Sequence, residues 1–223
     1  MQQKAVFLEL TEAWYDFLEQ QGNTPSLSLT DFSAFLQNKT QQQSVERRQM
    51  GGEQESWIDE TYNTQADDIA ILVVLLYRYA KNYIKKGLAD SKIQTADEFA
   101  FLITLVTFES LTKSELIQKM VMEKTSGTEV IKRLVKNGLM HEFADTDDKR
   151  SIRVALTPLG RQELFAALPR MSQVTKLVSG NLNRTELQSL SYLLRKLDHA
   201  HNLLYMQYRQ ASLEELQAQM DQL

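Results

Sequence analysis

The stretch that decides the fold is Asp147-Asp148-Lys149-Arg150-Ser151-Ile152-Arg153-Val154-Ala155-Leu156-Thr157-Pro158-Leu159-Gly160-Arg161. Every second residue from Ile152 to Leu156 is apolar, and this period of two predicts a strand with one buried face. Thr157 offers a hydroxyl that can cap a helix, and Pro158 suits the first helical position because its missing N–H is not needed there. The stretch therefore predicts a strand that leads directly into a helix.

The residues before this strand complete a small domain. A charged tip, Asp145 to Arg150, follows Gly138-Leu139-Met140-His141-Glu142-Phe143, which predicts a second short strand after a helix that ends at Gly138. Three capping boxes further upstream predict three short helices: Thr95-Ala96-Asp97-Glu98, Thr112-Lys113-Ser114-Glu115 and Ser126-Gly127-Thr128-Glu129. Three helices followed by a β-hairpin is the order of a winged helix-turn-helix.

Long helices are predicted on both sides of this domain. Residues 64 to 87, with Thr64 as cap, are apolar on nearly every side, so we expect a second subunit to cover this helix. After the hairpin, a helix runs from Pro158 to about residue 178, with a kink expected at Pro169. Capping residues at Asn183-Arg184-Thr185-Glu186 and Ser212-Leu213-Glu214-Glu215 predict a final long helix and a short terminal one.

The first 60 residues predict a separate helical part. Residues 1 to 20 are amphipathic, a second short helix starts at Thr30 or Asp31, and residues 39 to 55 are rich in Gln and charge, as in a linker. The predicted organisation has four segments. They are an N-terminal helical extension and linker (1–56), a dimerisation helix (57–94), a winged helix-turn-helix DNA-binding domain (95–161) and C-terminal dimerisation helices (162–223). The fold class is mainly α with a small β-hairpin wing.

Composition excludes several classes of protein. The 223 residues include no cysteine, so disulfides and thiolate metal sites are excluded. His199 and His201 stand two apart and point in different directions on a helix, so we expect no metal and no cofactor. No phosphate loop and no nucleophile elbow is present, so we expect no enzyme. The longest apolar run, Ile69 to Tyr77, is too short for a membrane span, and the N-terminus is unlike a signal peptide, so we expect a cytoplasmic protein without membrane contact.

The net charge of −4 counts mildly against DNA binding, since DNA-binding domains are often basic. Residues 95 to 161 contain ten basic and ten acidic side chains, which predicts only moderate attraction to DNA. Local clusters matter more than total charge. One cluster contains Lys81, Lys85 and Lys86, and a second contains Lys149, Arg150, Arg153 and Arg161.

Residues from about 64 to 205 resemble the MarR family of bacterial transcription regulators. The matching pieces are Arg133-Leu134-Val135-Lys136-Asn137-Gly138-Leu139, Asp148-Lys149-Arg150 and Leu156-Thr157-Pro158-Leu159-Gly160-Arg161, together with the spacing between them. The resemblance implies a homodimer whose first and last long helices interlock. It also implies a recognition helix from about Glu123 to Asn137 in the major groove, and a wing whose tip arginine, Arg150, is braced by Asp148 and enters the minor groove. Residues 1 to about 60 lie outside the resemblance.

We expect the DNA contacts to come from the recognition helix and the wing. The candidates are Lys124, Thr125, Ser126, Thr128, Glu129, Lys132, Lys149, Arg150 and Arg153. For Ser126 and Thr128 the alternative is that they only cap and solvate a helix, and for the wing residues that they form a solvated tip. Two residues depart from the family pattern: Glu129, where a polar or basic group is common, and Gly127, where a small apolar residue is usual. A carboxylate can accept from cytosine but repels phosphate.

The family often has a ligand cleft between the dimer helices and the winged helix. Tyr77, Tyr83 and Phe99 are the candidates to line it, which implies a small aromatic effector, although any one of these rings is more simply explained as core. A ligand in such a cleft would change the separation of the two recognition helices.

The leading hypothesis is a homodimeric, sequence-specific regulator, a repressor released by a ligand, that binds a pseudo-palindrome in double-stranded DNA. The alternative is a winged-helix module that docks proteins through its N-terminal helices without reading DNA. A third hypothesis has the extension reaching across the dimer. A mobility shift with DNA near the chain's own gene separates the first two, and sedimentation of a chain starting near Trp57 tests the third.

Overall fold

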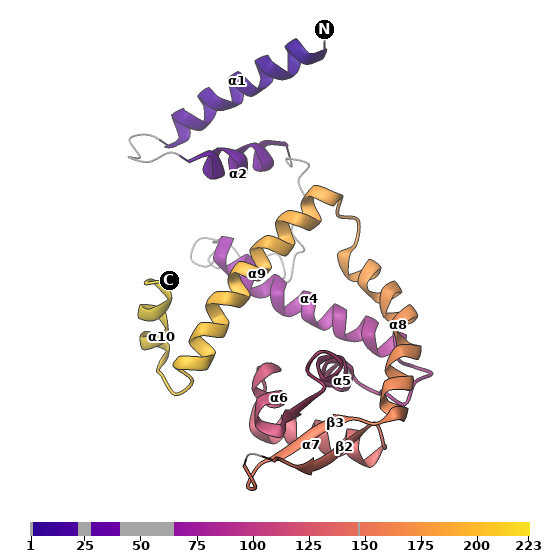
Figure 1. The fold of residues 1–223 in the computed structure, drawn as a ribbon. Coiled ribbons are helices and arrows are strands. Elements are labelled where there is room, and N and C mark those ends of the chain that lie inside the picture. Colours follow the sequence, from indigo (N-terminus) through magenta and orange to yellow (C-terminus); the bar gives the residue numbers. More distant parts are fainter. Residues whose placement is uncertain (1, 22–27, 41–64, 147) are drawn as a thin grey trace, which may run out of the picture. The chain divides into compact units, whose positions relative to one another are not determined.

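A computed structural model describes residues 2–21, 28–40, 65–146 and 148–223. Contacts divide the chain into two units, residues 1–63 and 64–223 (Figure 1). The predicted linker is described only at residues 39 and 40, which belong to a helix, and Thr64, the predicted cap, lies outside the described residues.

The first unit is a pair of helices, α1 (Gln2–Gln21) and α2 (Leu29–Thr40), and both predicted helices are confirmed. Phe17 is fully buried between them, with its ring 5.4 Å from those of Phe32 and Phe35. The second helix starts slightly earlier than predicted because Ser28 caps it: the Asp31 N–H donates to the Ser28 hydroxyl at 3.2 Å.

The second unit contains a winged head. Its helices are α5 (Ala96–Phe108), α6 (Lys113–Lys119) and α7 (Lys124–Lys136). An antiparallel sheet of order β1-β3-β2 is built from β1 (Ser110–Thr112), β2 (Met140–Ala144) and β3 (Ile152–Leu156). The predicted winged helix-turn-helix is confirmed, and so is the predicted hairpin, now β2–β3.

Strand β1 was not predicted from the sequence. It pairs with β3 so that Leu111 lies opposite Val154, and both side chains are buried in the core. Three residues are too few to show an alternating pattern, so only the pairing partner reveals this strand. Through this pairing, the edge of β3 that faces away from β2 is joined to β1 and so to the helical part of the head.

The core of the head is continuous with one face of the helix after the wing. Its fully or nearly buried members are Leu88, Ile93, Phe101, Leu102, Leu105, Leu111, Leu116, Ile117, Val130, Ile131, Leu134, Leu139, Met140, Val154, Leu164, Ala167, Met171 and Val174. These residues come from α5, α6, α7, the sheet, the helix after it and the segment before α5, so burial of apolar surface fixes α7 relative to the wing.

The Thr-Pro-Leu-Gly turn joins the sheet to the helices. Thr157 donates its hydroxyl to the Gly138 carbonyl at 2.6 Å and accepts from the Gly160 N–H at 2.9 Å. Gly160 lies so close to the backbone of Leu139 that an added Cβ would be 1.9 Å from its carbonyl oxygen. The predicted cap is confirmed, and the close approach explains the glycine.

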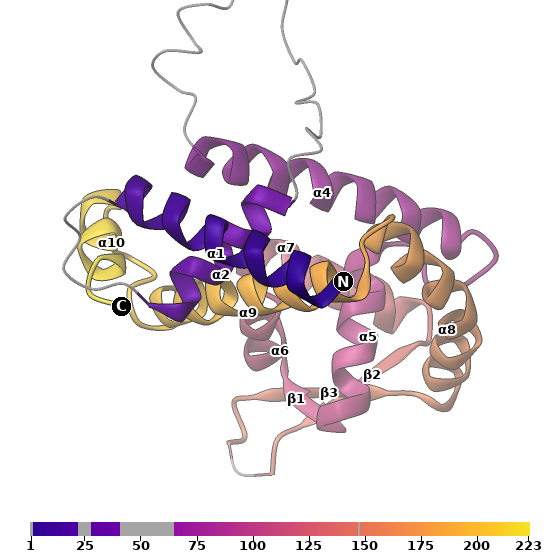
Figure 2. The same ribbon diagram turned by 90° about the horizontal axis from the view of Figure 1, so that it is seen from above.

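Four further helices surround the head: α4 (Gln65–Gly87), α8 (Pro158–Ser179), α9 (Arg184–Gln207) and α10 (Leu213–Met220). The C-terminal end of helix α4 packs against α8, as Figure 2 shows from above. Pro169 lies inside α8, which continues past it. None of the described helices combines the length and apolarity that a bilayer crossing requires.

The predicted capping boxes have mixed outcomes. Those at Thr112, Asn183 and Ser212 are confirmed. At Thr95 only half forms, because the Glu98 carboxylate accepts from the N–H of Gln94 and not from that of Thr95. The box predicted at residues 126–129 is wrong, because α7 starts at Lys124 and these residues lie inside it.

Candidate nucleic-acid interface

Helix α7 has one buried and one exposed face. Gly127, Val130, Ile131 and Leu134 are buried against the head. The opposite face carries side chains spaced four, three and four residues apart: Thr125, Glu129, Lys132 and Lys136, all of them exposed. This spacing places them along one line of the helix. The structure thus adds Lys136 to the predicted set; its position opposite the apolar stripe is a sequence signal that could have found it.

Gly127 permits the close packing of α7 on α6. A Cβ at this position would lie 2.6 Å from the Cγ1 atom of Ile117, well inside contact distance. The Ile117 side chain on the facing helix therefore occupies the space that a side chain at position 127 would need. The two helices form the helix-turn-helix pair, so this contact sets how α7 is presented.

The first turn of α7 exposes polar side chains and free N–H groups. Lys124, Thr125 and Ser126 are exposed, while the Thr128 hydroxyl donates to the Lys124 carbonyl at 2.6 Å. The N-cap, Glu123, makes no side-chain capping bond. Positive potential at a helix N-terminus favours phosphate, so this end of α7 suits a DNA backbone. Thr128, with its hydroxyl turned to its own helix, is less available than its neighbours.

Glu129 and Lys132 form an ion pair on the exposed face. The Lys132 Nζ atom is 2.7 Å from the Glu129 Oε1 atom. The hydrogen bond from this ammonium, together with its charge, lowers the pKa of Glu129 below its ordinary value. The carboxylate is therefore ionised at neutral pH, and the face presents an acceptor directly beside a donor.

A buried carboxylate fixes the other side of α7. Glu98 is fully buried in α5 and accepts from the Arg133 Nε at 3.0 Å and from the Gln94 N–H at 2.7 Å. Removing either partner would leave an uncompensated charge or an unsatisfied donor, so the pair holds α7 against α5. From the sequence, Glu98 was predicted only as a capping residue, and its bond to Arg133 was not predicted.

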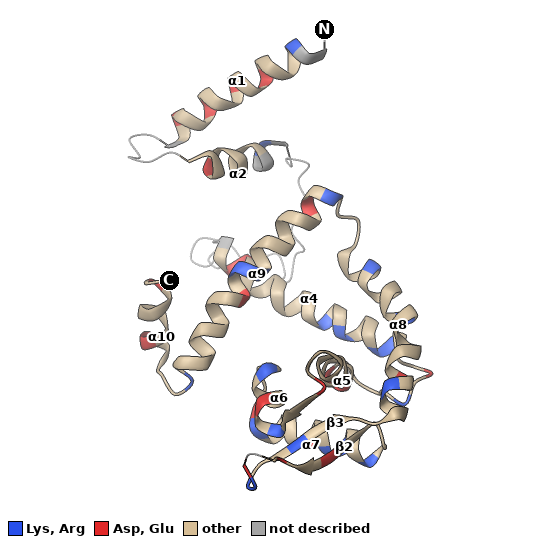
Figure 3. Ribbon diagram, in the orientation of Figure 1, with Lys and Arg blue, Asp and Glu red and all other residues tan. Residues whose placement is uncertain are grey.

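The turn between β2 and β3 is organised by Asp148. Its carboxylate accepts from the Arg150 N–H and the Ser151 hydroxyl, both at 2.9 Å. The resemblance implied that Asp148 braces Arg150, and in the structure the bond goes to the backbone of Arg150. Lys149 and Arg150 are both exposed at this tip (Figure 3).

Arg153 points to the base of the wing. Its Nη1 atom donates to Asp145 at 2.8 Å, and its Nη2 and Nε atoms donate to the carbonyl and hydroxyl of Ser110 at 3.0 and 3.1 Å. The guanidinium therefore joins β3 to β1 and to the start of the tip. All three side-chain nitrogens of Arg153 are thus directed to protein atoms, whereas the predicted role was a DNA contact.

The C-terminal end of α9 touches the start of α7. The Tyr205 hydroxyl donates to the Met122 carbonyl at 3.3 Å, and an Arg209 Nη atom lies 3.7 Å from the Glu123 carboxylate. Met122 and Glu123 immediately precede α7, so a helix predicted for dimerisation contacts the segment that leads into α7. Residues 83 positions apart, as Met122 and Tyr205 are, carry no joint signal in a single sequence.

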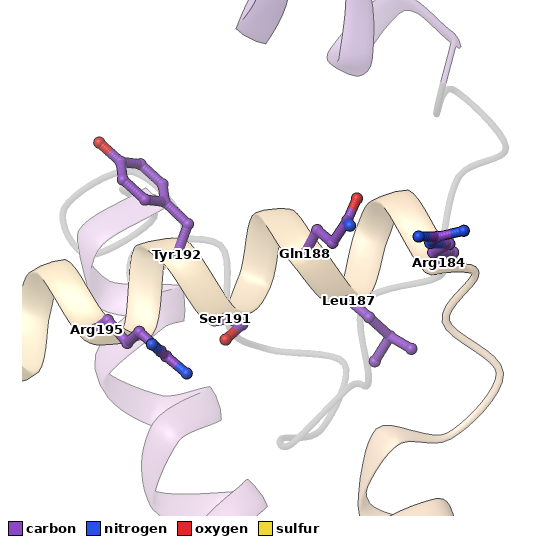
Figure 4. A pocket seen from close by; sticks show the side chains of 6 residues that line it. All are labelled: Arg184, Leu187, Gln188, Ser191, Tyr192 and Arg195. Carbon is purple, nitrogen blue, oxygen red and sulfur yellow. The ribbon is translucent and has the colours of Figure 1, made fainter.

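The candidate ligand residues lie in different environments. Tyr83 and Phe99 are partly buried against the core, whereas Tyr77 is exposed with the Lys81 ammonium 5.6 Å from its ring centre. A groove lies along α9 and is lined by Arg184, Leu187, Gln188, Ser191, Tyr192 and Arg195 (Figure 4). None of the three candidates lines this groove. In the part of the chain that the structure describes, no three metal-binding side chains come together.

Comparisons with known proteins agree with this geometry. Residues 95–152 match the MarR family. The chain is 26% identical over 140 residues to the HTH-type transcriptional repressor NicR of Pseudomonas putida, an alignment that covers 63% of this chain and 88% of that protein.

Two solved structures share the fold. One is BpsR of Bordetella bronchiseptica, whose DNA binding is regulated by 6-hydroxynicotinic acid; the TM-score is 0.55 and the identity 26%, over 59% of this chain and 98% of that one. The other is a mutant MarR from E. coli complexed with operator DNA; the TM-score is 0.56 and the identity 22%, over 63% of this chain and 96% of that one. At its lower identity, this second likeness shows the fold alone.

Proposed function

Residues 95–152 of this chain match the MarR family, and from that premise we propose that the protein is a DNA-binding transcription regulator of this family, a homodimeric repressor of a pseudo-palindromic operator in double-stranded DNA. One observation carries the proposal: a single packed head exposes both the polar line of α7 and the cationic wing tip. Such a head can place a helix in the major groove and the tip in the neighbouring minor groove. We place its site of action in the cytoplasm, with the DNA.

The homodimer is supported by apolar surface that this chain leaves uncovered. The exposed side chains on the long helices are Ile69, Ile71, Leu72, Val73, Val74, Leu76, Tyr77 and Tyr79 of α4, Leu177 and Val178 of α8, and Leu187, Leu190, Tyr192, Leu193, Leu194 and Leu197 of α9. A surface of this kind marks an interface, and a two-fold dimer covers it with the same surface of a second copy. We therefore assign dimerisation to residues 57–94 and 162–223.

The DNA contacts divide into two groups. Lys124, Thr125, Ser126, Thr128, Glu129, Lys132 and the added Lys136 belong to α7 and face the major groove. Lys149 and Arg150 reach the minor groove and its phosphates. Arg153 supports the wing through Asp145 and Ser110 and acts on DNA only through the shape of the tip.

Release by a small aromatic molecule is the regulatory part of the proposal. BpsR, a relative of similar fold, responds to 6-hydroxynicotinic acid. Tyr77, Tyr83 and Phe99 are the residues assigned to such a ligand, because they lie on α4 and α5 where the dimer helices meet the head. A ligand there changes the spacing of the two recognition helices, and half-sites about one helical turn apart tolerate little change.

Arg150→Ala tests the DNA-binding part of the proposal. Loss of the tip charge should weaken binding to every sequence and lower the salt dependence of log K by about 1 for each phosphate that is no longer neutralised. Fluorescence anisotropy with a labelled operator at several salt concentrations measures both. Lys176→Ala removes one positive charge from the far end of α8 and serves as the matched control. Equal affinities for Arg150→Ala and the control would exclude the wing as a DNA-binding element.

A second use is favoured by one observation in the N-terminal unit. Helix α2 reaches α1 near Asp16, which pairs with Lys39, while α1 is exposed throughout residues 4 to 10, including Val6, Phe7 and Leu10. An apolar helix face of this kind suits a partner protein. Loss of operator binding on removal of residues 1–56 would assign the extension to DNA binding, and unchanged binding would leave it to protein docking.

A further inference from the structure

We propose that the Glu129–Lys132 pair reads a single C·G base pair in each half-site of the operator, with the carboxylate on cytosine and the ammonium on guanine. The proposal deepens the proposed function and depends on it, because it names the base pair that α7 selects. It starts from the departure at residue 129, an acid in the middle of a helix face that is otherwise suited to DNA.

Glu129 is the one carboxylate of α7, and four cations share the helix: Lys124, Lys132, Arg133 and Lys136. Its side chain is 59% exposed, on the same line of the helix as Thr125, Lys132 and Lys136. An ion pair on the surface adds little to the stability of a helix, so α7 does not require an acid here in order to form. Facing phosphate, the acid opposes binding.

A base edge that offers a hydrogen-bond donor removes this conflict. In the major groove, cytosine presents its N4 amino group, and the paired guanine presents the acceptors O6 and N7 beside it. The carboxylate and ammonium of the pair, 2.7 Å apart, present an acceptor and a donor in the same order. Each group of the ion pair then meets its complement on one base pair.

The other base pairs fit less well. Adenine offers the N6 donor between two acceptors, its own N7 and the thymine O4, so a carboxylate placed there is repelled from both sides. Guanine and thymine present only acceptors to a carboxylate placed on their own edges. The pair therefore favours cytosine by attraction and disfavours the alternatives by repulsion, which is how strong specificity is usually achieved.

Selection of bound DNA from a random pool, at two salt concentrations, tests the inference with the full chain. The wild type should recover sites with C·G at one fixed position per half-site, and replacing that pair with T·A should lower affinity by about tenfold or more, within the range for a good base contact. Glu129→Gln should lose this preference and favour adenine, because an amide pairs with N6 and N7 of adenine.

Glu123→Gln is the matched control. It removes the same charge from the residue before α7, where the side chain is exposed and makes no capping bond, and the amide oxygen of Gln can still accept from Arg209, which lies 3.7 Å from the Glu123 carboxylate. This variant should bind more tightly to all sequences while keeping the C·G preference. Both substituted side chains are exposed, so both variants should fold, which a thermal melt verifies.

The outcomes distinguish the cytosine readout from the DNA-binding function on which it depends. A wild-type protein that enriches no sequence overturns both. A wild-type protein that enriches an operator while Glu129→Gln keeps the same base at every position overturns the cytosine readout alone. A shift of preference in Glu129→Gln and none in Glu123→Gln supports the inference.

Discussion

The head and the long helices use the same kinds of residue in opposite ways. In the head, Leu102 of α5 and Leu134 of α7 are 0% exposed, whereas Leu72 of α4 and Leu193 of α9 are 52% and 53% exposed. All four lie in helices with apolar residues at helical spacing. The head buries its apolar surface within one chain, while the long helices leave theirs exposed, where the proposed dimer would cover it. The sequence pattern indicates an apolar face, and only the structure shows which of these faces the single chain buries by itself.

The largest expected effect is in the head. Phe101→Ala removes a fully buried ring from the core and should reduce the free energy of unfolding by about 3–5 kcal/mol. Chemical denaturation followed by circular dichroism measures the change. Tyr192→Ala, which truncates an exposed ring on α9, is the comparison within the single chain. A loss below about 1 kcal/mol for Phe101→Ala would show that the head is less tightly packed than its burial indicates.

A smaller effect is expected in the long helices, and it should depend on protein concentration. Leu193→Ala removes an exposed apolar side chain of α9 and should weaken the dimer by about 2 kcal/mol, the value of a leucine buried between two copies. Sedimentation equilibrium of wild type and variant measures the dissociation constant. A wild type that remains a monomer at micromolar concentration would contradict the proposed role of these helices.

The smallest effect concerns acid and lies at the edge of the head. Hydrogen bonds from the Thr112 N–H and hydroxyl lower the pKa of Glu115. A group whose pKa is lower in the folded state stabilises the protein above its unfolded pKa, and this stabilisation is lost as the pH falls through the folded pKa. Denaturation at neutral pH and at pH about 3 should show a smaller acid loss in Glu115→Gln than in the wild type. Identical losses of stability in the two proteins would mean that the capping box formed by Thr112 and Glu115 does not respond to pH.

Much of the fold follows from local signals. Alternating residues at 152–156, the Thr157 cap and the glycine at 138 are sufficient to predict the wing and the start of α8, because each acts within a few residues. Strand β1 escaped because its pairing with β3 joins residues about 40 positions apart. The capping signal alone placed the start of α7 too late because Ser126 imitates a cap, while the real N-cap, Glu123, makes no capping bond; the start near Glu123 that the family resemblance implied is confirmed.

The residues of the candidate interface likewise divide into those that local sequence signals predict and those that only the fold brings together. Exposure of Lys124, Lys132 and the wing tip follows from helical spacing and from the charge of the tip, so these positions could be predicted. The role of Arg153 could not, because its partners Ser110 and Asp145 are brought to it by the sheet. The bond between Glu98 and Arg133 escaped for the same reason, since it joins two helices across the core.

Because Tyr205 and Arg209 contact the residues before α7, a tilt of α9 is transmitted to the start of α7. The 24 residues of α9 span about 36 Å, so a tilt of about 5° at one end moves the other end by about 3 Å. A movement of that size is close to the rise of one base pair. A ligand or a mutation that tilts the far end of α9 only slightly would therefore shift the start of α7 by nearly the rise of one base pair.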